Sequence, residues 1–152
     1  MPRAPLQVIV IPCRQAPNGG SQFVVFHRVK PEMWQFISGG GESGESPEQA
    51  ARREALEEAG IPNTRSLMKL DAMASIPRSA FPTSAHWPND LFVVPEYSFA
   101  VDASDAEIAL SCEHDSYEWV SYESAMKLLT WESNRVALWE LNERLKRHQC
   151  VG

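Results

Sequence analysis

Apolar residues occur along this chain in short runs separated by polar turns, which is the pattern of a protein built largely on β-strands. Two runs rich in Val, Ile and Phe, residues 6–11 and 23–29, flank the turn signal at residues 17–20. We therefore predict that they pair as antiparallel strands. Further strands are predicted at residues 34–37, 69–76, 91–94, 96–101 and 117–120.

Two segments between these strands are predicted to be irregular. The run Ser38-Gly39-Gly40-Gly41 is expected to interrupt regular structure, because glycine has the greatest conformational freedom. The Pro-containing residues 77–88 are predicted to form a loop and one wall of a substrate site. The aromatic residues of that loop either clamp a ring of the substrate or anchor the loop by burial; they are Phe81, His86 and Trp87.

The clearest helix signal begins at Ser46. Ser46 is predicted to be the N-cap, Pro47 the first helical residue, and Gln49 the partner of Ser46 in a capping box. Gly60 supplies the C-terminal stop. The sequence thus predicts a helix over residues 47–59.

Two further helices complete the predicted set of elements. Ser121 is expected to cap a short helix that runs through Leu129, and residues 133–147 place Leu residues at the spacing of an amphipathic helix. Strands mixed with three helices predict a layered α/β or α+β fold. With 152 residues, of which 43% are hydrophobic, we expect residues 1–152 to form a single domain.

Composition bears on the cellular location of the protein and on the state of its cysteines. No apolar run exceeds four residues, so we expect neither a transmembrane helix nor a signal peptide, and we expect a cytoplasmic location. The three cysteines, Cys13, Cys112 and Cys150, are far apart and odd in number. That pattern favours reduced thiols over a disulfide framework or a zinc site.

The net charge of −6 is unevenly distributed along the chain. Residues 42–58 carry six Glu and two Arg, and residues 102–118 carry six acidic residues with no Lys or Arg. By difference, the rest of the chain is mildly basic. The total argues against binding of duplex DNA or of an anionic membrane through a broad basic face, so we expect no nucleic-acid surface and no membrane partner.

The first acidic block contains three carboxylates that a helix would place on one face. Glu54 and Glu58 are one turn apart, and Glu57 lies beside them. Like charges at this spacing cost about 0.2–0.5 kcal/mol per pair in an isolated helix. A hard divalent cation such as Mg²⁺ or Mn²⁺ would offset that cost, because both ions prefer oxygen ligands and also accept substrate phosphates.

These residues carry a resemblance to the Nudix hydrolases. The family signature is Gly, five residues, Glu, seven residues, Arg-Glu, an apolar residue, any residue, Glu-Glu, any residue, Gly and an apolar residue. All seven fixed positions match; they are Gly39, Glu45, Arg53, Glu54, Glu57, Glu58 and Gly60. The resemblance implies a mixed β-sheet sandwiched between helices, and Mg²⁺-assisted attack of water on a phosphorus of a nucleoside diphosphate linked to another group.

The resemblance also implies a role for each matched residue. Glu57 and Glu58 are expected to be the principal metal ligands, together with the Gly39 carbonyl. Glu54 is expected to be either a ligand or the base that deprotonates water. Arg53 is expected to hold the acidic cluster in place. Glu45 is expected to support this cluster and is counted among the residues near the substrate.

Four residues outside the signature are also implicated. The segment containing Glu113 and His114 resembles one in bacterial dihydroneopterin triphosphate pyrophosphatases and in dinucleoside tetraphosphate hydrolases. Glu113 is therefore expected to act as a metal ligand or base, unless it belongs to a solvated acidic loop, and His114 is expected to position it. Arg28 is expected to contact substrate phosphate. Trp34 is expected either to stack on a base or pterin ring or to be a packing aromatic.

The sequence thus favours a Mg²⁺-dependent pyrophosphohydrolase acting on a nucleoside or pterin triphosphate, preferably dihydroneopterin triphosphate, as a monomer or homodimer. The matching segments lie around the signature, at Glu113 and at Trp131. One alternative is a dinucleoside tetraphosphate hydrolase, which would share the metal site. The other is a catalytically silent nucleotide-binding module, against which the complete set of repelling carboxylates argues.

Overall fold

The fold, seen here in a computed structural model, is described for residues 2–82, 84–149 and 151 of the chain. Its helices are α1 (Pro47–Ala59), α2 (Tyr122–Leu128) and α3 (Glu132–Lys146), with short 3-10 turns η1 (Arg78–Ala80) and η2 (Ser84–His86). Its strands are β1 (Arg3–Gln15), β2 (Ser21–Val29), β3 (Glu32–Gln35), β4 (Ile37–Glu42), β5 (Leu67–Pro77), β6 (Val93–Asp102) and β7 (Ser116–Val120).

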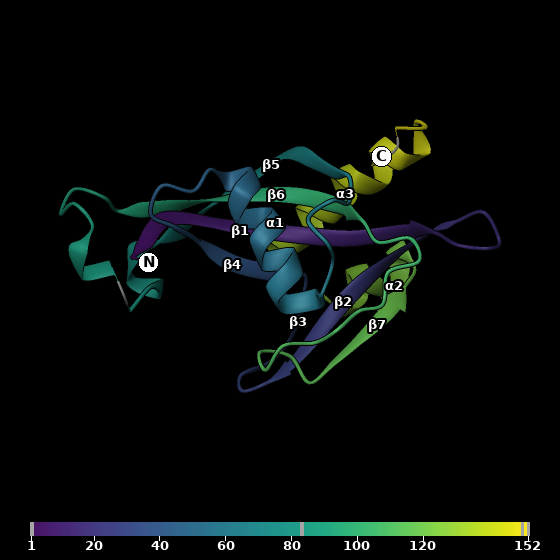
Figure 1. The fold of residues 1–152 in the computed structure, drawn as a ribbon, viewed down its shortest axis with the longest axis horizontal. Helices are drawn as coiled ribbons and strands as arrows, with labels where there is room; N and C mark the ends of the chain where they lie inside the picture. The colour runs from purple at the N-terminus through teal and green to yellow at the C-terminus, as the bar shows by residue number, and fades with distance from the viewer. Residues whose placement is uncertain (1, 83, 150, 152) are drawn as a thin grey trace.

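The strands form one mixed sheet whose long central member is β1 (Figure 1). The order along the main path is β3-β2-β1-β6-β5, while β4 pairs with β1 and β7 pairs with β2. β1 and β2 are antiparallel, as predicted, whereas β1 and β6 are parallel. The sheet therefore has the mixed character expected from the sequence.

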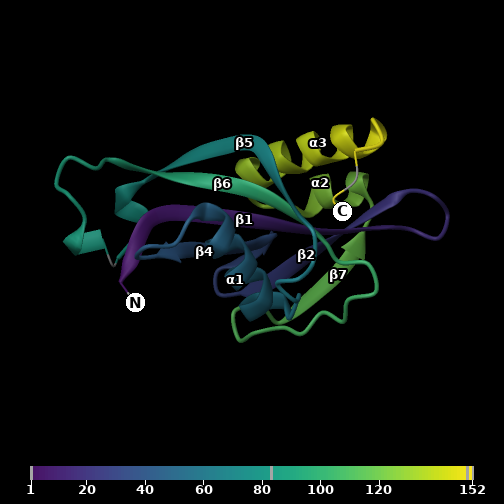
Figure 2. The same cartoon turned by 45° about the horizontal axis from the view of Figure 1, so that its top comes forward.

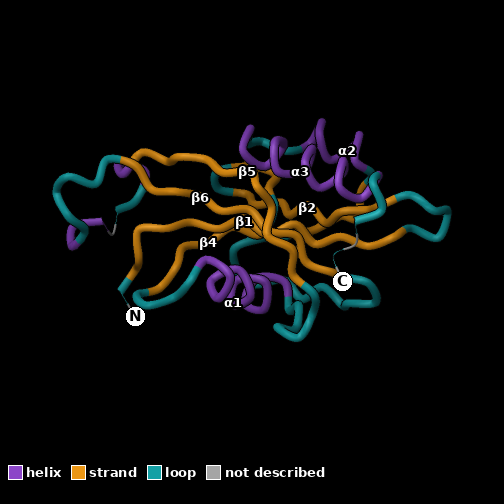
Figure 3. The backbone as a smooth tube through the Cα atoms, turned by 90° about the horizontal axis from the view of Figure 1, so that it is seen from above, coloured by secondary structure: helices purple, strands orange, loops and turns teal. Residues whose placement is uncertain are grey.

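Helices cover both faces of the sheet, with α1 on one side and α2 and α3 on the other (Figures 2 and 3). Alternate residues of β1 face the two layers: Ile9 and Ile11 pack with Leu138 of α3, and Val10 packs with Ala55 of α1. This period-two alternation is what a strand buried on both faces requires. The predicted layered fold is confirmed.

The ends of α1 follow the sequence signals. Ser46 accepts a hydrogen bond from the Gln49 backbone N–H at 3.1 Å, and the Gln49 side chain accepts one from the Ser46 N–H at 2.9 Å. Gly60 closes the helix at φ 69°, a left-handed conformation that glycine adopts without strain. These two caps fix which residues of α1 lie over the sheet.

The prediction that Ser38 to Gly41 would interrupt regular structure is wrong, because these residues belong to β4. Gly39 and Gly40 pair in register with Val8 and Gln7 of β1. They are needed for close approach and not for a turn: a Cβ on Gly39 would lie 2.1 Å from the Glu54 carboxyl carbon, and one on Gly40 would lie 2.0 Å from Arg3 Nε.

Other boundaries also differ from the predicted ones. The segment predicted as one strand at residues 34–37 is divided between β3 and β4 at Phe36. β6 begins at Val93 and continues through Pro95, so residues 91 and 92 precede it. β1 extends well beyond the predicted residues 6–11 at both ends. The strand cores were found correctly, but their lengths depend on pairing partners that the local sequence does not show.

The loop at residues 77–88 is anchored to the body of the protein. Phe81 and Trp87 are 9% and 4% exposed and form a small cluster with Val94. The Trp87 Nε1–H donates a hydrogen bond to the Arg3 carbonyl at 2.8 Å. For these two aromatics, the structure therefore shows the anchoring alternative.

Two further features bear on the expectations from composition. Cys13 is buried and Cys112 is exposed, and both are free thiols, while Cys150 lies outside the described residues. Within the described part of the chain, none of the helices has the length and apolar character needed to cross a membrane.

Candidate active site

A cleft of about 400 Å³ opens beside β4 and the first residues of β1. Its walls come from β1, β2, β3, β4 and α1, and from the segment between β6 and β7. Gly39, Arg53, Glu54, Glu113 and Arg28, all singled out from the sequence, line it. The fold thus gathers around one cavity residues that are up to 110 positions apart, from Arg3 to Glu113.

Arg53 of α1 holds the acidic residues on one side of this cleft. Its guanidinium nitrogens lie within 3.2 Å of carboxylate oxygens of four residues, Glu42, Glu45, Glu54 and Glu57. It also donates a hydrogen bond to the Gly40 carbonyl at 2.8 Å. A single planar cation with five donors therefore ties α1 to β4 and fixes the carboxylates against one another.

Glu45 shows the effect of this pairing. Its two carboxylate oxygens accept hydrogen bonds from Arg53 at 2.7 and 3.0 Å, and Oε1 also accepts from the Glu42 backbone N–H at 2.8 Å. The hydrogen bonds from Arg53 lower the pKa of Glu45. With both oxygens engaged, Glu45 has the contacts of a supporting residue, and it does not line the cleft.

Glu54 lies between the Arg53 guanidinium and β4, the strand that contains Gly39, Gly40 and Gly41 and is called the glycine strand below. Arg53 Nη1 donates to its Oε1 at 2.9 Å, and its carboxyl group occupies the space that a Gly39 side chain would take. Burial raises the pKa of Glu54. This carboxyl group is thus held against backbone atoms of β4 at the floor of the cleft.

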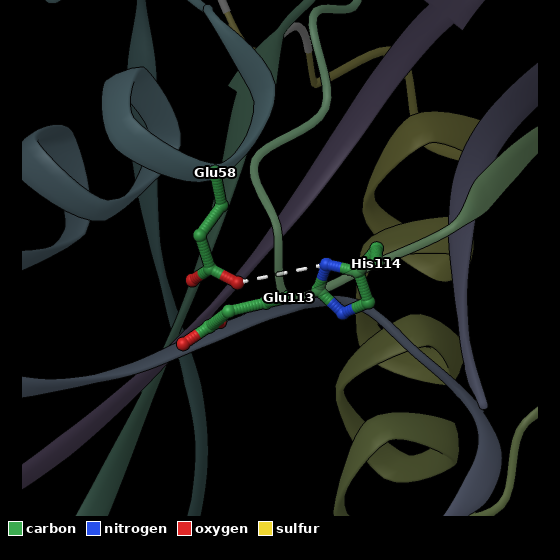
Figure 4. Close-up of side chains that lie close together, drawn as sticks. All are labelled: Glu58, Glu113 and His114. Carbon is green, nitrogen blue, oxygen red and sulfur yellow. Dashed lines mark ion pairs between the residues drawn. The ribbon is translucent and has the colours of Figure 1, made fainter. Parts of the chain in front are cut away.

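Glu58 is the most deeply buried carboxyl group of the cluster. It is 3% exposed, and neither of its oxygens has a hydrogen-bond partner among the described residues. Burial, reinforced by the nearby Glu113, raises the pKa of Glu58 to about 11. Ligand atoms of Glu58, Glu113 and His114 lie within 4.8 Å of one another. Figure 4 shows these three side chains gathered at one place.

A buried carboxylate without partners is costly unless a proton or a cation neutralises it. The donor set around Glu58 consists mainly of carboxylate oxygens, which Mg²⁺ and Mn²⁺ prefer. Glu57, by contrast, is 57% exposed at the side chain and pairs with Arg53 at 3.1 Å. The residues present therefore fit a hard divalent cation, and Glu58 is the most deeply buried carboxyl group that could hold one.

Two arginines bring positive charge to the cleft. The Nε atoms of Arg3 and Arg28 are both buried and have no hydrogen-bond partner within the described part of the chain. Arg3 Nη2 donates to Gln7, its cation lies 4.9 Å from the Phe81 ring centre, and Arg28 Nη2 donates to the Lys30 carbonyl at 3.5 Å. Among the described residues, neither guanidinium is paired with a carboxylate within 4.0 Å.

Arg28 was predicted from the sequence to be a site residue, whereas Arg3, Gln7 and Gln35, which also line the cleft, were not. A usable signal was present, because Arg3 and Gln7 are polar residues spaced four apart in a strand that is otherwise mostly apolar. Trp34, in contrast, does not line the cleft. Its ring packs at 4.9 Å from that of His27, and its backbone N–H bonds to Thr130.

Curated relatives match this chain over part of their own length. An octanoyltransferase from Myxococcus xanthus is 39% identical over 122 residues, covering 78% of this chain and 32% of that protein. An RNA pyrophosphohydrolase from Francisella tularensis subsp. mediasiatica is 36% identical over 101 residues, covering 59% of this chain and 62% of that protein. The chain therefore spans less than two thirds of either relative.

Solved structures match nearly the whole chain. A NUDIX protein from Listeria monocytogenes has a TM-score of 0.86 and 44% identity, covering 96% of this chain and 97% of that one. The dihydroneopterin triphosphate pyrophosphohydrolase of E. coli has a TM-score of 0.72 and 24% identity, with 93% and 99% coverage. An Ap4A hydrolase complex from C. elegans has a TM-score of 0.68 and 22% identity, with 93% and 97% coverage. At these lower identities, the last two show a shared fold.

The family of this chain is given by a domain model that matches most of its length. The model of the NUDIX domain matches residues 5–139, which include the glycine strand, all of α1 and the Glu113 segment. The arrangement of sheet, helices and acidic cluster agrees with that match. This chain belongs to the Nudix family.

Proposed function

We propose that this chain is a Mg²⁺-dependent Nudix pyrophosphohydrolase that converts a nucleoside or pterin triphosphate to a monophosphate and pyrophosphate. The observation that carries the proposal is the buried carboxyl group of Glu58, which has no hydrogen-bond partner among the described residues and lies beside Glu113. Glu113 lines a cleft that also contains Arg3 and Arg28, and neither arginine forms an ion pair within the described residues. Such a site offers oxygen ligands for a cation and guanidinium groups for phosphates.

The proposed metal ligands are those predicted from the sequence: Gly39, Glu54, Glu57, Glu58 and Glu113. When bound, Mg²⁺ supplies positive charge that stabilises the phosphoryl transition state and acidifies a coordinated water. Mn²⁺ would fit the same oxygen donors. Arg53 keeps the carboxylates oriented through its four ion pairs.

The reaction needs a base and a phosphate clamp. Glu54 and Glu113 are the two predicted base candidates that line the cleft, and the raised pKa of Glu54 suits a group that takes a proton from water. Arg28 and Arg3 would bind the phosphate oxygens, since their guanidinium groups face the same cleft without carboxylate partners. Hydrolysis then breaks one P–O–P bond, and pyrophosphate leaves.

Dihydroneopterin triphosphate is the favoured substrate because the Trp131 segment resembles the enzymes that act on it; the Glu113 segment is shared with dinucleoside tetraphosphate hydrolases. Trp131 is 47% exposed, and its Nε1–H donates to the cleft-lining Gln35 at 3.3 Å, so an aromatic surface lies beside the phosphate site. A dinucleoside tetraphosphate would use the same metal site, and this is the second candidate. We further propose that residues 1–152 act as a single Nudix domain.

A substrate panel with product identification tests the proposal. The panel contains dihydroneopterin triphosphate, nucleoside triphosphates, diadenosine tetraphosphate and a triphosphorylated RNA oligomer, each with Mg²⁺ or Mn²⁺. Pyrophosphate released from a pterin or nucleoside triphosphate is the expected result. Release of ATP and AMP from diadenosine tetraphosphate would support the second candidate. Nucleotide binding without turnover of any compound would show a binding module.

Substitution at Glu57 tests the carboxylate cluster. Glu57→Gln is expected to lower kcat by about 100-fold or more with an unchanged fold, because it removes one proposed metal ligand and one partner of Arg53. The matched control is Glu48→Gln on the same helix, where the carboxylate is exposed and pairs with Arg52 at 3.5 Å. Equal activities of the two variants would remove Glu57 from the site.

Substitution at Glu113 separates a site residue from a charged loop. Glu113→Gln is expected to reduce turnover by about 10-fold or more, because Glu113 lines the cleft and lies beside Glu58. The matched control is Asp105→Asn, because Asp105 lies in the same connection between β6 and β7. Its backbone has φ 59°, a conformation that Asn also adopts. If both substitutions reduce the steady-state rate equally, Glu113 is part of a solvated acidic loop.

A further inference from the structure

A chain of polar contacts connects the rim of the cleft to the buried carboxyl group of Glu58. The Trp131 Nε1–H donates to Gln35 Oε1 at 3.3 Å, and Gln35 Nε2 lies 3.0 Å from His114 Nε2. On the other side of the imidazole, His114 Nδ1 lies 3.8 Å from Glu58 Oε1. Four residues from β3, α1, the 103–115 segment and the start of α3 are thus aligned in order.

The first contact fixes the orientation of the Gln35 side chain. An indole N–H can only donate, so the oxygen of the amide must face Trp131. The amide nitrogen of Gln35 then faces His114 and donates to it. This assignment follows from the donor and acceptor chemistry of Trp131, Gln35 and His114.

The orientation of Gln35 in turn fixes the proton on His114. Because Gln35 Nε2 carries only hydrogens, His114 Nε2 must offer a lone pair, and the ring proton must be on Nδ1. A doubly protonated imidazole would place two donors against each other at 3.0 Å. The neutral tautomer with Nδ1–H is the one that satisfies this contact.

The Nδ1–H therefore points toward a carboxyl group that needs a partner. His114 Nδ1 and both Glu58 oxygens are buried, and none of these atoms has a hydrogen-bond partner in residues 2–82, 84–149 and 151. His114 is 4% exposed, and the Phe26 ring packs against the imidazole with a centroid distance of 5.3 Å. The surrounding packing holds the ring in an orientation that faces Glu58 (Figure 4).

The geometry alone permits two roles for His114. Its nitrogen lies within 4.8 Å of ligand atoms of Glu58 and Glu113, which would suit a third metal ligand. A ligand nitrogen, however, must present a lone pair, whereas Nδ1 carries the proton in the tautomer derived above. The hydrogen bonds of Gln35 therefore favour a hydrogen-bonding role for His114 Nδ1 over a metal-binding one.

We propose that, when the cation binds, the Glu58 carboxylate moves closer than its present 3.8 Å and accepts a hydrogen bond from His114 Nδ1–H, so that His114 is a positioning residue and not itself a metal ligand. This role rests on the proposed metal site. The hydrogen bond would stabilise the ionised form of Glu58 and orient one oxygen, leaving the other for the cation. Gln35 and Trp131 contribute by holding the imidazole in the required tautomer.

The first test is the tautomer of His114 in the metal-free protein. Long-range proton–nitrogen NMR spectra distinguish a protonated ring nitrogen from an unprotonated one. We expect the protonated signal for Nδ1 and the unprotonated signal for Nε2. The reverse assignment would overturn the proposal, and this measurement does not depend on catalytic activity or on any substitution.

The second test is a matched pair of substitutions. In His114→Asn, the amide nitrogen can take the place of Nδ1, whereas in His114→Gln it reaches toward the place of Nε2. We expect His114→Gln to weaken Mn²⁺ binding by about 10- to 100-fold and His114→Asn to retain affinity within about threefold. Affinity is measured by EPR titration of free Mn²⁺, with circular dichroism as the check of folding.

Pulsed EPR of the wild-type protein decides the ligand question directly. Mn²⁺ bound to protein containing isotopically labelled histidine should show no coupling from a directly coordinated nitrogen. Direct coupling, or equal loss of affinity in both variants, would overturn the positioning role. A wild-type protein that binds no Mn²⁺ would overturn the proposed function and this role with it. Bound Mn²⁺ with direct coupling would overturn this role alone.

Discussion

The buried carboxyl group of Glu58 is the constraint on which the rest of the site depends. It sits in the interior without a hydrogen-bond partner, next to Glu113, and burial favours its neutral form. Arg53, the strong cation of the cluster, is engaged by four other carboxylates. Among the described residues, the basic group recorded within 4.0 Å of Glu58 is His114. This imbalance is what a divalent cation would relieve.

The fold brings charged side chains of the site into close contact with the backbone of β4. Glycines in β4 let the Glu54 carboxyl group and the Arg3 guanidinium lie directly against the strand. The caps at Ser46 and Gly60 set the rotation and the end of α1, so that its alanine face packs on the sheet and its acidic face meets β4. The same contacts that bury the sheet thus bring carboxylates and arginines to one cleft.

Much of this arrangement could be predicted from the sequence, because its signals are local. The helix caps, the spacing of Glu54, Glu57 and Glu58, and the strand cores all follow from short-range patterns. The glycine strand could not be recognised, since its need for glycine comes from Glu54 and Arg3, which are distant in sequence. The tautomer of His114 depends on Gln35, 79 residues away, and so it also required the folded structure.

The protonation of Glu58 offers the most direct test of this account. Because burial and the nearby Glu113 raise the pKa of Glu58, we expect Glu58 to hold a proton at neutral pH in the metal-free protein, whereas a metal ligand must be ionised. Calorimetric titration with Mg²⁺ or Mn²⁺ at neutral pH, in buffers of different ionisation enthalpy, measures the protons released. The account predicts release of about one proton per protein, abolished in Glu58→Gln. A wild-type binding enthalpy that does not vary with the buffer would contradict it.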